Sequence, residues 1–431
     1  MRLGGRLAAA IEVLTDIETR RRPSADALKD WGLSHRFAGS GDRAAIGNLV
    51  YDALRRKRSA AYILDSDEPR AVAIGAWLLE TGMDALRLDA LLDGDRFAPP
   101  PLSDAERAAF SARDLAGAPD AVRADIPDWC VPLFAARFGD RWVEEAAALS
   151  QRPPLDLRVN TLKSDRAAVE AELAETGAVP TRLASQGLRI APIAGEGRHP
   201  NVQVEPAFRK GWFEVQDEGS QLAAEIAGVG PGMQVLDLCA GAGGKTLALA
   251  ALMENRGQIY AHDSDKQRLA PIFDRLDRAG ARDVQVLARR AGLAELEGRM
   301  DLVLIDAPCT GSGTWRRRPD AKWRLTDRQL DVRRAEQSAL FEQAAPYVRP
   351  GGRLVYVTCS VFAEENEVQV QRFLDGAPDF TALDPQALWH QRFPDATDSA
   401  LFPGGAGISL TPATSGTDGF FVSVLEKRAD G

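Results

Sequence analysis

The stretch VLDLCAGAGGKT, Val235 to Thr246, decides the fold that this sequence predicts. An apolar strand leads into a glycine-rich turn, and a helix follows over Thr246 to Met253. Gly241, Gly243 and Gly244 have no Cβ atom, so they permit a tight turn and let the backbone approach a ligand closely. A plain strand-to-helix connection gives the same pattern, so this loop alone leaves ligand binding open.

The next predicted strand favours ligand binding. It covers Gln258 to His262, and Asp263 follows it, about 20 residues after the loop. In nucleotide-binding sheets an acid at this place accepts hydrogen bonds from ribose hydroxyls, so loop and acid together indicate a nucleoside-containing cofactor. The loop lacks the spacing of a phosphate-cradling ATPase loop, although Lys245 and Thr246 keep that alternative open.

Strands and helices alternate along the rest of the C-terminal half. Apolar runs predict strands at 234–238, 258–262, 284–287, 301–305 and 353–358, and a final hairpin from 407–410 and 419–425. Such alternation produces parallel βαβ units. We therefore expect an α/β fold with a doubly wound, Rossmann-like sheet over residues 211–431.

Two further domains are expected before this sheet. Apolar residues at helical spacing, such as Ile11, Leu14 and Ile17, predict an all-helical segment over residues 1–95. Pro-rich composition over 96–125 predicts a linker or a loosely packed connector, so the helical domain with this segment spans 1–125. Strands at 155–159 and 187–191 and a helix at 167–176 predict a small α+β module over 126–210.

Composition restricts the class of protein. The chain has 431 residues, of which 45% are hydrophobic, and a formal net charge of −9. Its four cysteines and four histidines show neither disulfide nor metal-ligand spacing, so we expect no disulfide framework and no metal. No run of about 18 apolar residues occurs, and Glu12 and Asp16 interrupt the apolar N-terminus, so we expect neither a membrane span nor a signal peptide. We expect a cytoplasmic protein with no membrane partner.

Two more motifs place a cysteine after an apolar strand. In VLIDAPCTGSGT, Val303 to Thr314, the strand ends at Asp306 and Cys309 follows. In LVYVTCSVFAEENE, Leu354 to Glu367, Cys359 follows the strand directly, and Glu364, Glu365 and Asn366 begin a helix. Each cysteine alone could be a small buried side chain. Two at the same edge of a parallel sheet, where ligands bind, favour a thiol site.

These motifs resemble the RsmB/NOP family of S-adenosylmethionine-dependent RNA 5-methylcytosine methyltransferases. The resemblance covers residue 126 to the C-terminus. It rests on CAGAGGKT (239–246), DAPCTGSGTWRRRPDAKW (306–323), VTCS (357–360), RVNTLK (158–163), VQDEGSQL (215–222) and TDGFF (417–421). DRAAIGNLVYDALRRKR, Asp42 to Arg58, resembles the NusB-like RNA-binding domain that is fused to bacterial RsmB-type members.

The resemblance implies covalent catalysis. Carbon 5 of cytosine is a poor nucleophile, and a thiolate that adds at carbon 6 turns the ring into an enamine able to attack a sulfonium methyl group. By resemblance, Cys359 is this nucleophile and Cys309 assists release of the product. Asp306 would hydrogen-bond the N3 and amino edge of the base, best in its protonated form. Lys245 would lie near the substrate or near Asp306; the alternative is a solvated lysine at a helix start.

The resemblance also implies the cofactor contacts. S-adenosylmethionine would lie against Cys239, Ala240, Gly241, Ala242, Gly243, Gly244 and Lys245, with Asp263 on the ribose hydroxyls and Arg268 and Asp306 nearby. The family usually has an aspartate near the adenine after the third strand. This chain has Leu287-Ala-Arg-Arg290 there, and Ala242 where many relatives have proline.

Basic residues flank two tryptophans beside the Cys309 motif. Residues 315–334 and residues 1–60 each carry a surplus of five positive charges, on an acidic background. Cations bind phosphates while an indole stacks, so the candidate RNA contacts are Arg316, Arg317, Arg318 and Lys322, around Trp315 and Trp323. The alternative is a solvated basic loop with two core tryptophans.

We therefore expect a monomeric RNA (cytosine-5) methyltransferase that acts on small-subunit ribosomal RNA. Two alternatives remain: a transfer RNA cytosine-C5 methyltransferase, and a non-catalytic RNA-binding or ribosome assembly factor. DNA is not an expected substrate. The target base must leave its stack to reach a thiol at the sheet edge, so unpaired or flipped RNA is expected.

Overall fold

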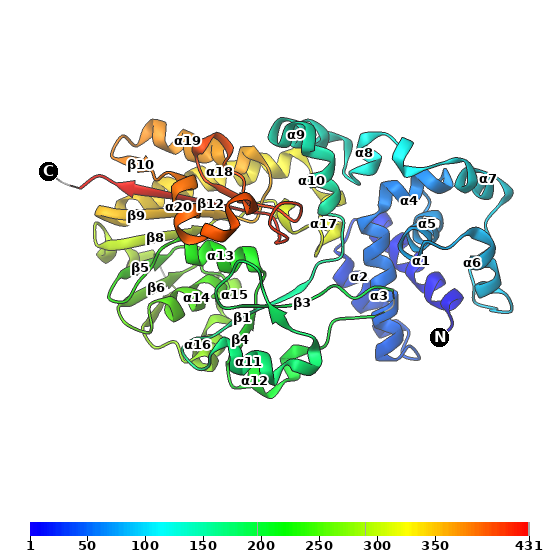
Figure 1. Cartoon of the computed structure of the whole chain (residues 1–431), viewed down its shortest axis with the longest axis horizontal. Coiled ribbons are helices and arrows are strands. Elements are labelled where there is room, and N and C mark those ends of the chain that lie inside the picture. Colours follow the sequence, from blue (N-terminus) through cyan, green and yellow to red (C-terminus); the bar gives the residue numbers. More distant parts are fainter. Residues whose placement is uncertain (196, 289, 430–431) are drawn as a thin grey trace. The chain divides into compact units, whose positions relative to one another are not determined.

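The computed structural model describes residues 1–195, 197–288 and 290–429, and the chain folds into two compact units. The helical unit comprises Met1–Arg152, Ile193–Arg198 and Trp315–Leu325. The sheet unit comprises Pro153–Pro192, His199–Thr314 and Thr326–Gly431 (Figure 1). The division into three domains with limits at 125 and 210 stays a prediction.

Helices form the helical unit. They are α1 (Leu3–Arg20), α2 (Ser24–Ser34), α3 (Ser40–Arg55), α4 (Lys57–Leu64), α5 (Pro69–Thr81), α6 (Ala85–Leu92), α7 (Asp104–Ala112), α8 (Asp120–Arg123), α9 (Val131–Phe138), α10 (Trp142–Ala148) and α17 (Pro319–Arg324). Apolar faces of α1, α3 and α5 meet in its core, where Leu14, Ile46 and Val72 are buried. The all-helical structure predicted for residues 1–95 is confirmed, since all of these residues are described and none lies in a strand.

The segment predicted to be a linker or a loosely packed connector is partly helical. Residues 96–125 contain α7 and α8, and Leu102, Val122 and Ala124 are buried. The start of α7 is a capping box, in which Ser103 and Glu106 each accept a hydrogen bond from the backbone of the other. This Ser-x-x-Glu pattern is a helix-start signal that the proline content of the segment obscures.

The segment Trp315–Leu325 belongs to the helical unit although it follows the Cys309 motif directly. The Trp315 ring packs against Phe134, with ring centroids 6.0 Å apart. The Trp323 indole N–H donates to the carbonyl oxygen of Leu54. The Ser24 hydroxyl donates to the Asp320 carboxylate over 2.9 Å. These contacts anchor α17 among the N-terminal helices.

A small antiparallel sheet begins the sheet unit. Its strand order is β2–β3–β1–β4, from β1 (Leu155–Val159), β2 (Val179–Pro180), β3 (Gly187–Ile190) and β4 (Phe213–Val215). It is accompanied by α11 (Arg166–Glu172) and α12 (Pro206–Arg209), and Leu157, Val169 and Phe213 are buried together. The strands predicted at 155–159 and 187–191 are confirmed, and the predicted helix ends earlier, at Glu172.

The main sheet has eight strands. Its order is β10–β12–β9–β8–β5–β6–β7, with β11 beside β12. The bounds are β5 (Gln234–Asp237), β6 (Gln258–His262), β7 (Val284–Leu287), β8 (Met300–Asp306), β9 (Val348–Thr358), β10 (Phe380–Ala382), β11 (Ile408–Leu410) and β12 (Phe420–Lys427). Strands β7, β6, β5, β8 and β9 are parallel, and β10, β11 and β12 pair antiparallel. The predicted Rossmann-like sheet is confirmed; only β10 was not predicted.

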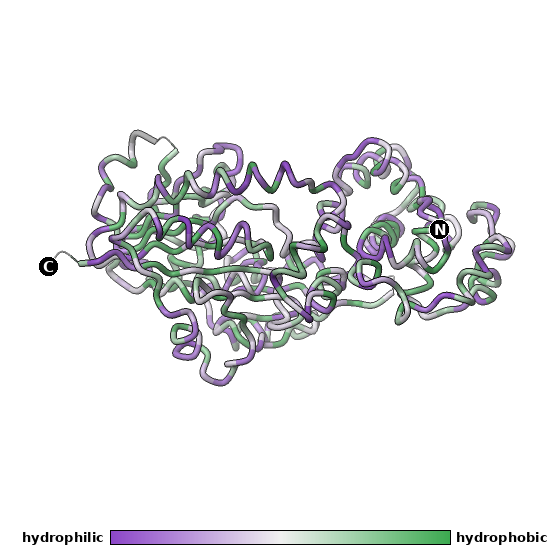
Figure 2. Tube along the Cα trace, turned by 90° about the horizontal axis from the view of Figure 1, so that it is seen from above, coloured by the Kyte–Doolittle hydropathy of each residue, from purple (hydrophilic) through white to green (hydrophobic). Residues whose placement is uncertain are grey.

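Helices cover both faces of this sheet (Figure 1). They are α13 (Glu218–Ile226), α14 (Gly244–Leu252), α15 (Lys266–Leu269), α16 (Ile272–Ala279), α18 (Asp327–Ala344), α19 (Glu367–Gly376) and α20 (Pro385–Arg392). Successive strand residues pack in opposite cores: Leu302 and Leu304 face one core, and Val303 and Ile305 face the other. Central parallel strands buried on both sides are therefore continuously apolar. Green, hydrophobic stretches of the Cα trace run through the sheet unit (Figure 2).

Strand order determines where a site can form. The chain runs from β5 to β6 and β7 on one side, and then to β8 and β9 on the other side of β5. The carboxyl ends of β5, β8 and β9 consequently meet at this reversal, which is where open α/β sheets bind ligands. Among the described residues, no helix is long and apolar enough to cross a membrane.

Two glycines in the interior of helices test the packing of the helical unit. A Cβ atom on Gly75 of α5 would lie 2.6 Å from the carbonyl oxygen of Ala60 in α4, whereas one on Gly47 of α3 would meet only Leu28, at 3.9 Å. We expect Gly75→Ala to lower the free energy of unfolding by about 1–3 kcal/mol. Gly47→Ala should raise it by about 0.5–1 kcal/mol. Denaturant unfolding of both variants checks this, and shifts of the same sign would contradict it.

Candidate active site

Two cysteines from neighbouring strands meet at the carboxyl edge of the main sheet. Cys309 follows β8, Cys359 follows β9, and their sulfur atoms lie 3.4 Å apart, both half-buried. The Gly313 amide donates to the carbonyl oxygen of Cys359 over 3.0 Å, which joins the two loops. The contact with Cys359 and burial raise the pKa of the Cys309 thiol. Either sulfur atom can be the donor in this contact.

Lys245 and Asp306 form an ion pair at the same edge. The Lys245 Nζ lies 2.8 Å from the Asp306 carboxylate, and the Lys245 side chain is only 6% exposed. The ammonium also lies over the Phe420 ring, 5.3 Å from its centroid. Lys245 is therefore not the solvated lysine of the alternative interpretation, and its charge fixes the Asp306 carboxylate in place.

The backbone of the glycine-rich loop packs closely against its neighbours. Gly241 has a φ of 51°, and its amide donates to the buried Asp263 carboxylate over 2.9 Å. Gly243 has a φ of 84°, and a Cβ atom there would lie 2.6 Å from the Ile272 side chain. Arg268 is 55% exposed, with its guanidinium 4.0 Å from Asp263. Loop and acid are thus adjacent, as predicted.

The flanking motifs support this loop within the sheet unit. The Arg158 guanidinium donates to the carbonyl oxygen of Gly244 over 2.9 Å and to the side chain of Gln216. Burial lowers the pKa of Arg158 to about 10. The Asp217 carboxylate accepts from the amide of Asp418, which joins VQDEGSQL to TDGFF. Arg158 thus anchors the start of α14, directly after the glycine-rich loop.

Asp237, at the end of β5, is a polar residue that the sequence analysis missed. It is fully buried, and the Thr246 hydroxyl donates to its Oδ2 over 2.7 Å. Its Oδ1 has no hydrogen-bond partner among the described residues. Burial raises its pKa to about 7. The available signal was an acid that ends an otherwise apolar strand directly before the loop.

Glu365 is the second missed residue. Its side chain is fully buried, and it accepts hydrogen bonds from Thr310 and Ser360, which follow the two cysteines. In the sequence it stands among other acids at a helix start, so nothing distinguishes it.

The residues predicted to contact RNA differ in their exposure to solvent. Lys322 has no exposed surface: its Nζ donates to the carbonyl oxygen of Arg55 and to the Ser150 hydroxyl, and burial lowers its pKa to about 8. The prediction for Lys322 is therefore corrected, because a fully buried ammonium cannot contact a phosphate. Arg316 is also buried, Arg317 is half-buried and Arg318 is exposed.

The other basic runs are largely neutralised within the helical unit. Arg55 pairs with Asp52, Arg56 with Glu80, Lys57 with Glu18, and Arg58 with Asp128. Arg20 and Arg22 likewise pair with carboxylates of α1 and α2. A positive surplus in the sequence is therefore not the same as an unpaired positive surface.

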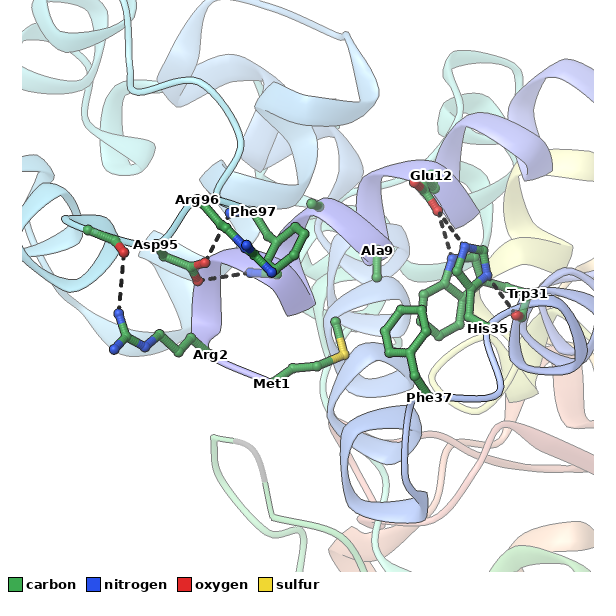
Figure 3. Close-up of a pocket in the computed structure, with 13 residues that line it drawn as sticks. Met1, Arg2, Ala9, Glu12, Trp31, His35, Phe37, Asp95, Arg96 and Phe97 are labelled. Carbon is green, nitrogen blue, oxygen red and sulfur yellow. Dashed lines mark hydrogen bonds and ion pairs between the residues drawn. The ribbon is translucent and has the colours of Figure 1, made fainter.

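A cavity of about 740 Å³ lies in the helical unit, apart from the predicted catalytic residues. Trp31 and His35 stack in its wall at 4.3 Å between ring centroids, Phe37 meets His35 edge-on, and Phe97 lies on the other side (Figure 3). Its charged groups Glu12 and Asp95 hydrogen-bond Trp31 and the backbone of Gly5. The volume of a cavity does not by itself indicate catalysis, so the candidate active site remains the one at the strand ends.

The next observations concern possible metal ligands and the segment after the third strand of the sequence prediction. Among the described residues, no group of three or more His, Cys, Asp or Glu side chains could hold a metal ion. Of the segment 287–290 after the third strand, Arg289 lies outside the described residues. The carbonyl oxygen of Leu287 contacts His262 Nδ1 at 2.7 Å.

Known proteins resemble the chain in sequence and in fold. A family model described as 16S rRNA methyltransferase RsmB/F matches residues 229–426, and a model of the ferredoxin-like domain of RsmF/B-like methyltransferases matches residues 126–193. A probable ribosomal RNA small subunit methyltransferase B of Synechocystis sp. is 30% identical over 450 residues, which cover 97% of this chain and 98% of the relative. Ribosomal RNA small subunit methyltransferase B of Citrobacter koseri is 33% identical, over 70% of this chain and 66% of the relative.

Solved structures agree with these sequence matches. The crystal structure of PH0851 is 27% identical, with a TM-score of 0.73 over 99% of both chains. A methyltransferase homolog from Pyrococcus horikoshii is 29% identical, with a TM-score of 0.59 over 72% of this chain and 97% of that chain. With a relative matched along nearly its whole length and the family's motifs assembled at one sheet edge, the chain belongs to the RsmB/F family of 16S rRNA methyltransferases.

Proposed function

We propose that this protein transfers a methyl group from S-adenosylmethionine to carbon 5 of a cytosine in RNA, through a covalent adduct between Cys359 and carbon 6. The observation that carries the proposal is the 3.4 Å contact between the Cys309 and Cys359 sulfur atoms at the strand ends. The ion pair at the same edge between the buried Lys245 and the partly exposed Asp306 supports it. A non-catalytic RNA-binding protein would need neither the paired thiols nor this ion pair.

The reaction begins when the Cys359 thiolate adds to carbon 6, which makes carbon 5 nucleophilic. S-adenosylmethionine, when bound, supplies an electrophilic methyl group, which carbon 5 takes as the sulfonium becomes a neutral thioether. A base then takes the carbon 5 proton, which ends in the solvent. The electrons of that carbon–hydrogen bond re-form the double bond between carbons 5 and 6, the bond between carbon 6 and Cys359 breaks, and the thiolate is restored. The net by-product is one proton. Cys309 assists this release, since its sulfur lies beside that of Cys359.

Asp306 and Lys245 orient the base. The Asp306 carboxylate would accept from the amino group of cytosine, which holds the ring with carbon 6 towards the thiols. The Lys245 ammonium, 2.8 Å from that carboxylate, prevents it from rotating away. Correct placement of reacting atoms is one of the largest contributions that a protein makes to a bimolecular step.

The loop after β5 suits the proposed cofactor. Gly241 and Gly243 bring the backbone close to a ligand, and Asp263 lies where ribose hydroxyls would be bound. The Oδ1 atom of the buried Asp237 has no hydrogen-bond partner among the described residues, so it can accept from a ligand. The ammonium group at the methionine end of the cofactor would be the donor. Cys239, whose thiol pKa burial raises, would contact the cofactor as a neutral group.

The substrate proposed is small-subunit ribosomal RNA, because the relatives are named as methyltransferases of that RNA. The protein would act in the cytoplasm as a monomer, on an unpaired or flipped cytosine. Transfer RNA as substrate, and a non-catalytic assembly role, are separate outcomes of the same assay.

Removing each thiol should have a different effect. We expect Cys359→Ala to abolish transfer of labelled methyl groups from S-adenosylmethionine to unmodified ribosomal RNA, because no adduct forms. Cys309→Ala should accumulate a protein–RNA adduct, because release is impaired. Scintillation counting and denaturing gels measure both, with transfer RNA and ribosomal particles as parallel substrates. A Cys359→Ser protein with full activity would contradict the nucleophile assignment, and an inactive wild type would favour the assembly role.

The proposed Asp237 contact predicts that cofactor binding depends on pH. Because its pKa is about 7, binding of a cation to the carboxylate must expel a proton below neutral pH. We expect the affinity for S-adenosylmethionine to increase about fivefold to tenfold between pH 6 and pH 7.5. Calorimetric titration measures this. Asp237→Asn is the control for titration of the ligand itself, and it should bind more weakly with a flatter pH profile; equal profiles would remove Asp237 from the site.

The exposed Arg318 should contribute to RNA affinity. We expect Arg318→Gln to weaken binding of a ribosomal RNA fragment about threefold to tenfold and to reduce the salt dependence by about one phosphate contact. Arg256→Gln is the matched control, because Arg256 is 62% exposed and precedes β6, at the opposite edge of the sheet. Fluorescence anisotropy at several salt concentrations measures both. Equal losses would mean that only total charge matters.

A further inference from the structure

Glu365 occupies an unusual position behind the two cysteines. It lies in the short turn Ala363–Glu365 between β9 and α19, and its side chain has no exposed surface. The carboxylate accepts four hydrogen bonds. Its donors are the Thr310 amide at 2.8 Å, the Thr310 hydroxyl at 2.5 Å, the Ser360 hydroxyl at 2.5 Å and the Gln337 amide group at 3.0 Å.

The donors identify what this carboxylate holds. Thr310 follows Cys309 in the chain, and Ser360 follows Cys359. One side chain therefore fastens the residue after each cysteine to the same point. Gln337 of α18 extends the arrangement, because its amide group also donates to the carbonyl oxygen of Pro308 over 3.0 Å. Cys309 is thus held on both of its sides.

Contacts beyond Glu365 tie the same two loops together. The Ser312 and Ser360 hydroxyls are 2.9 Å apart, and the Val361 amide donates to the Ser312 hydroxyl. The Tyr356 hydroxyl donates to the backbone carbonyl oxygen of Glu365 over 2.7 Å, which fixes the turn that carries the carboxylate. The network thus links the end of β9 to the loop after β8.

Packing alone does not explain a charge at this place. The four donors to Glu365 are neutral groups, so they stabilise the carboxylate without an opposite charge. A buried carboxylate held this way is costly, and an apolar side chain of similar size would avoid the desolvation. Burial raises the pKa of Glu365, and hydrogen bonds from Ser360, Thr310 and Gln337 oppose that rise. Unlike an apolar side chain, a carboxylate has several acceptor positions, so it can bind donors on different loops at once.

We propose that Glu365 is the positioning residue of the two-cysteine site: it binds the loops after β8 and β9 to each other and so sets the separation of the Cys309 and Cys359 sulfur atoms. The inference rests on the proposed function of these thiols. Glu365 contacts the residues next to them and acts through those residues. Its negative charge also raises the pKa of Cys309, which favours the thiol form.

Three variants test this. Glu365→Gln keeps one acceptor oxygen but replaces the other with an amide group, opposite the Thr310 and Ser360 hydroxyls. Thr310→Val removes a single hydroxyl bond and preserves the shape of the side chain, so it serves if Glu365→Gln does not fold. Glu364→Gln is the matched control, because Glu364 is the adjacent half-buried acid and its Oε2 has no hydrogen-bond partner among the described residues.

The first measurement is steady-state methyl transfer. We expect Glu365→Gln to lower kcat at least about tenfold while the KM values for RNA and cofactor stay within about twofold, since misplaced groups slow the chemical step without weakening binding. Thr310→Val should lower kcat by a smaller factor, about threefold, because one bond of four is lost. The control should keep wild-type values. An increase in the KM for RNA at unchanged kcat would make Glu365 a binding residue and overturn the proposal.

The second measurement does not depend on catalysis. Hydrogen exchange followed by mass spectrometry should show faster exchange in both segments 306–314 and 357–366 of Glu365→Gln, and alkylation of Cys309 by iodoacetamide should accelerate. The control should show neither change. If the wild type transfers no methyl group to any RNA, the proposed function fails, and this measurement still tests the positioning. A folded Glu365→Gln protein with unchanged exchange in both segments would overturn the inference.

Discussion

The hydrogen-bond ladder between β8 and β9 is the constraint on which the site depends. The two parallel strands pair up to Asp306 opposite Val357, and the Ala307 amide extends the ladder to the carbonyl oxygen of Val357 over 2.8 Å. Because the ladder continues to the last residue before each loop, the two cysteine loops start side by side. A shift of this register by one residue would turn alternate side chains to the opposite face and separate the loops.

Several charged groups of the site are buried, and each is stabilised by a different kind of partner. Lys245 has an opposite charge in Asp306, Arg158 has backbone and side-chain carbonyl oxygens, and Glu365 has neutral donors. Removing an ion from water costs several kcal/mol unless partners replace its hydration. Asp237 has one hydrogen-bond partner, and burial raises the pKa of this carboxyl to about 7. The Asp237 carboxylate, which lacks a partner for Oδ1 among the described residues, thus lies beside the loop where the ligand is proposed to bind.

The sequence allowed most of the sheet to be predicted, for a physical reason. Central parallel strands such as Val303–Ile305 and Leu354–Val357 are buried on both faces, so they appear as uninterrupted apolar runs. The three-residue edge strand β10 has too little pattern to be recognised. Of the predicted site, Cys309, Cys359, Lys245 and Asp306 do come to one edge of the sheet, because each stands at or after the end of a strand whose place in the sheet is known.

Other parts of the site depend on contacts that no local pattern contains. Nothing in the local sequence distinguishes Lys322 from a solvated lysine, and its burial depends on Arg55 and Ser150, which are far away in the chain. Glu365 is one acid among several, and only its donors on another loop distinguish it. The helical unit has the same property, because α17 reaches it from residues 315–325. During synthesis the N-terminal helices therefore leave the ribosome long before their last partner exists. The unit can complete its core only after about three quarters of the chain has been made.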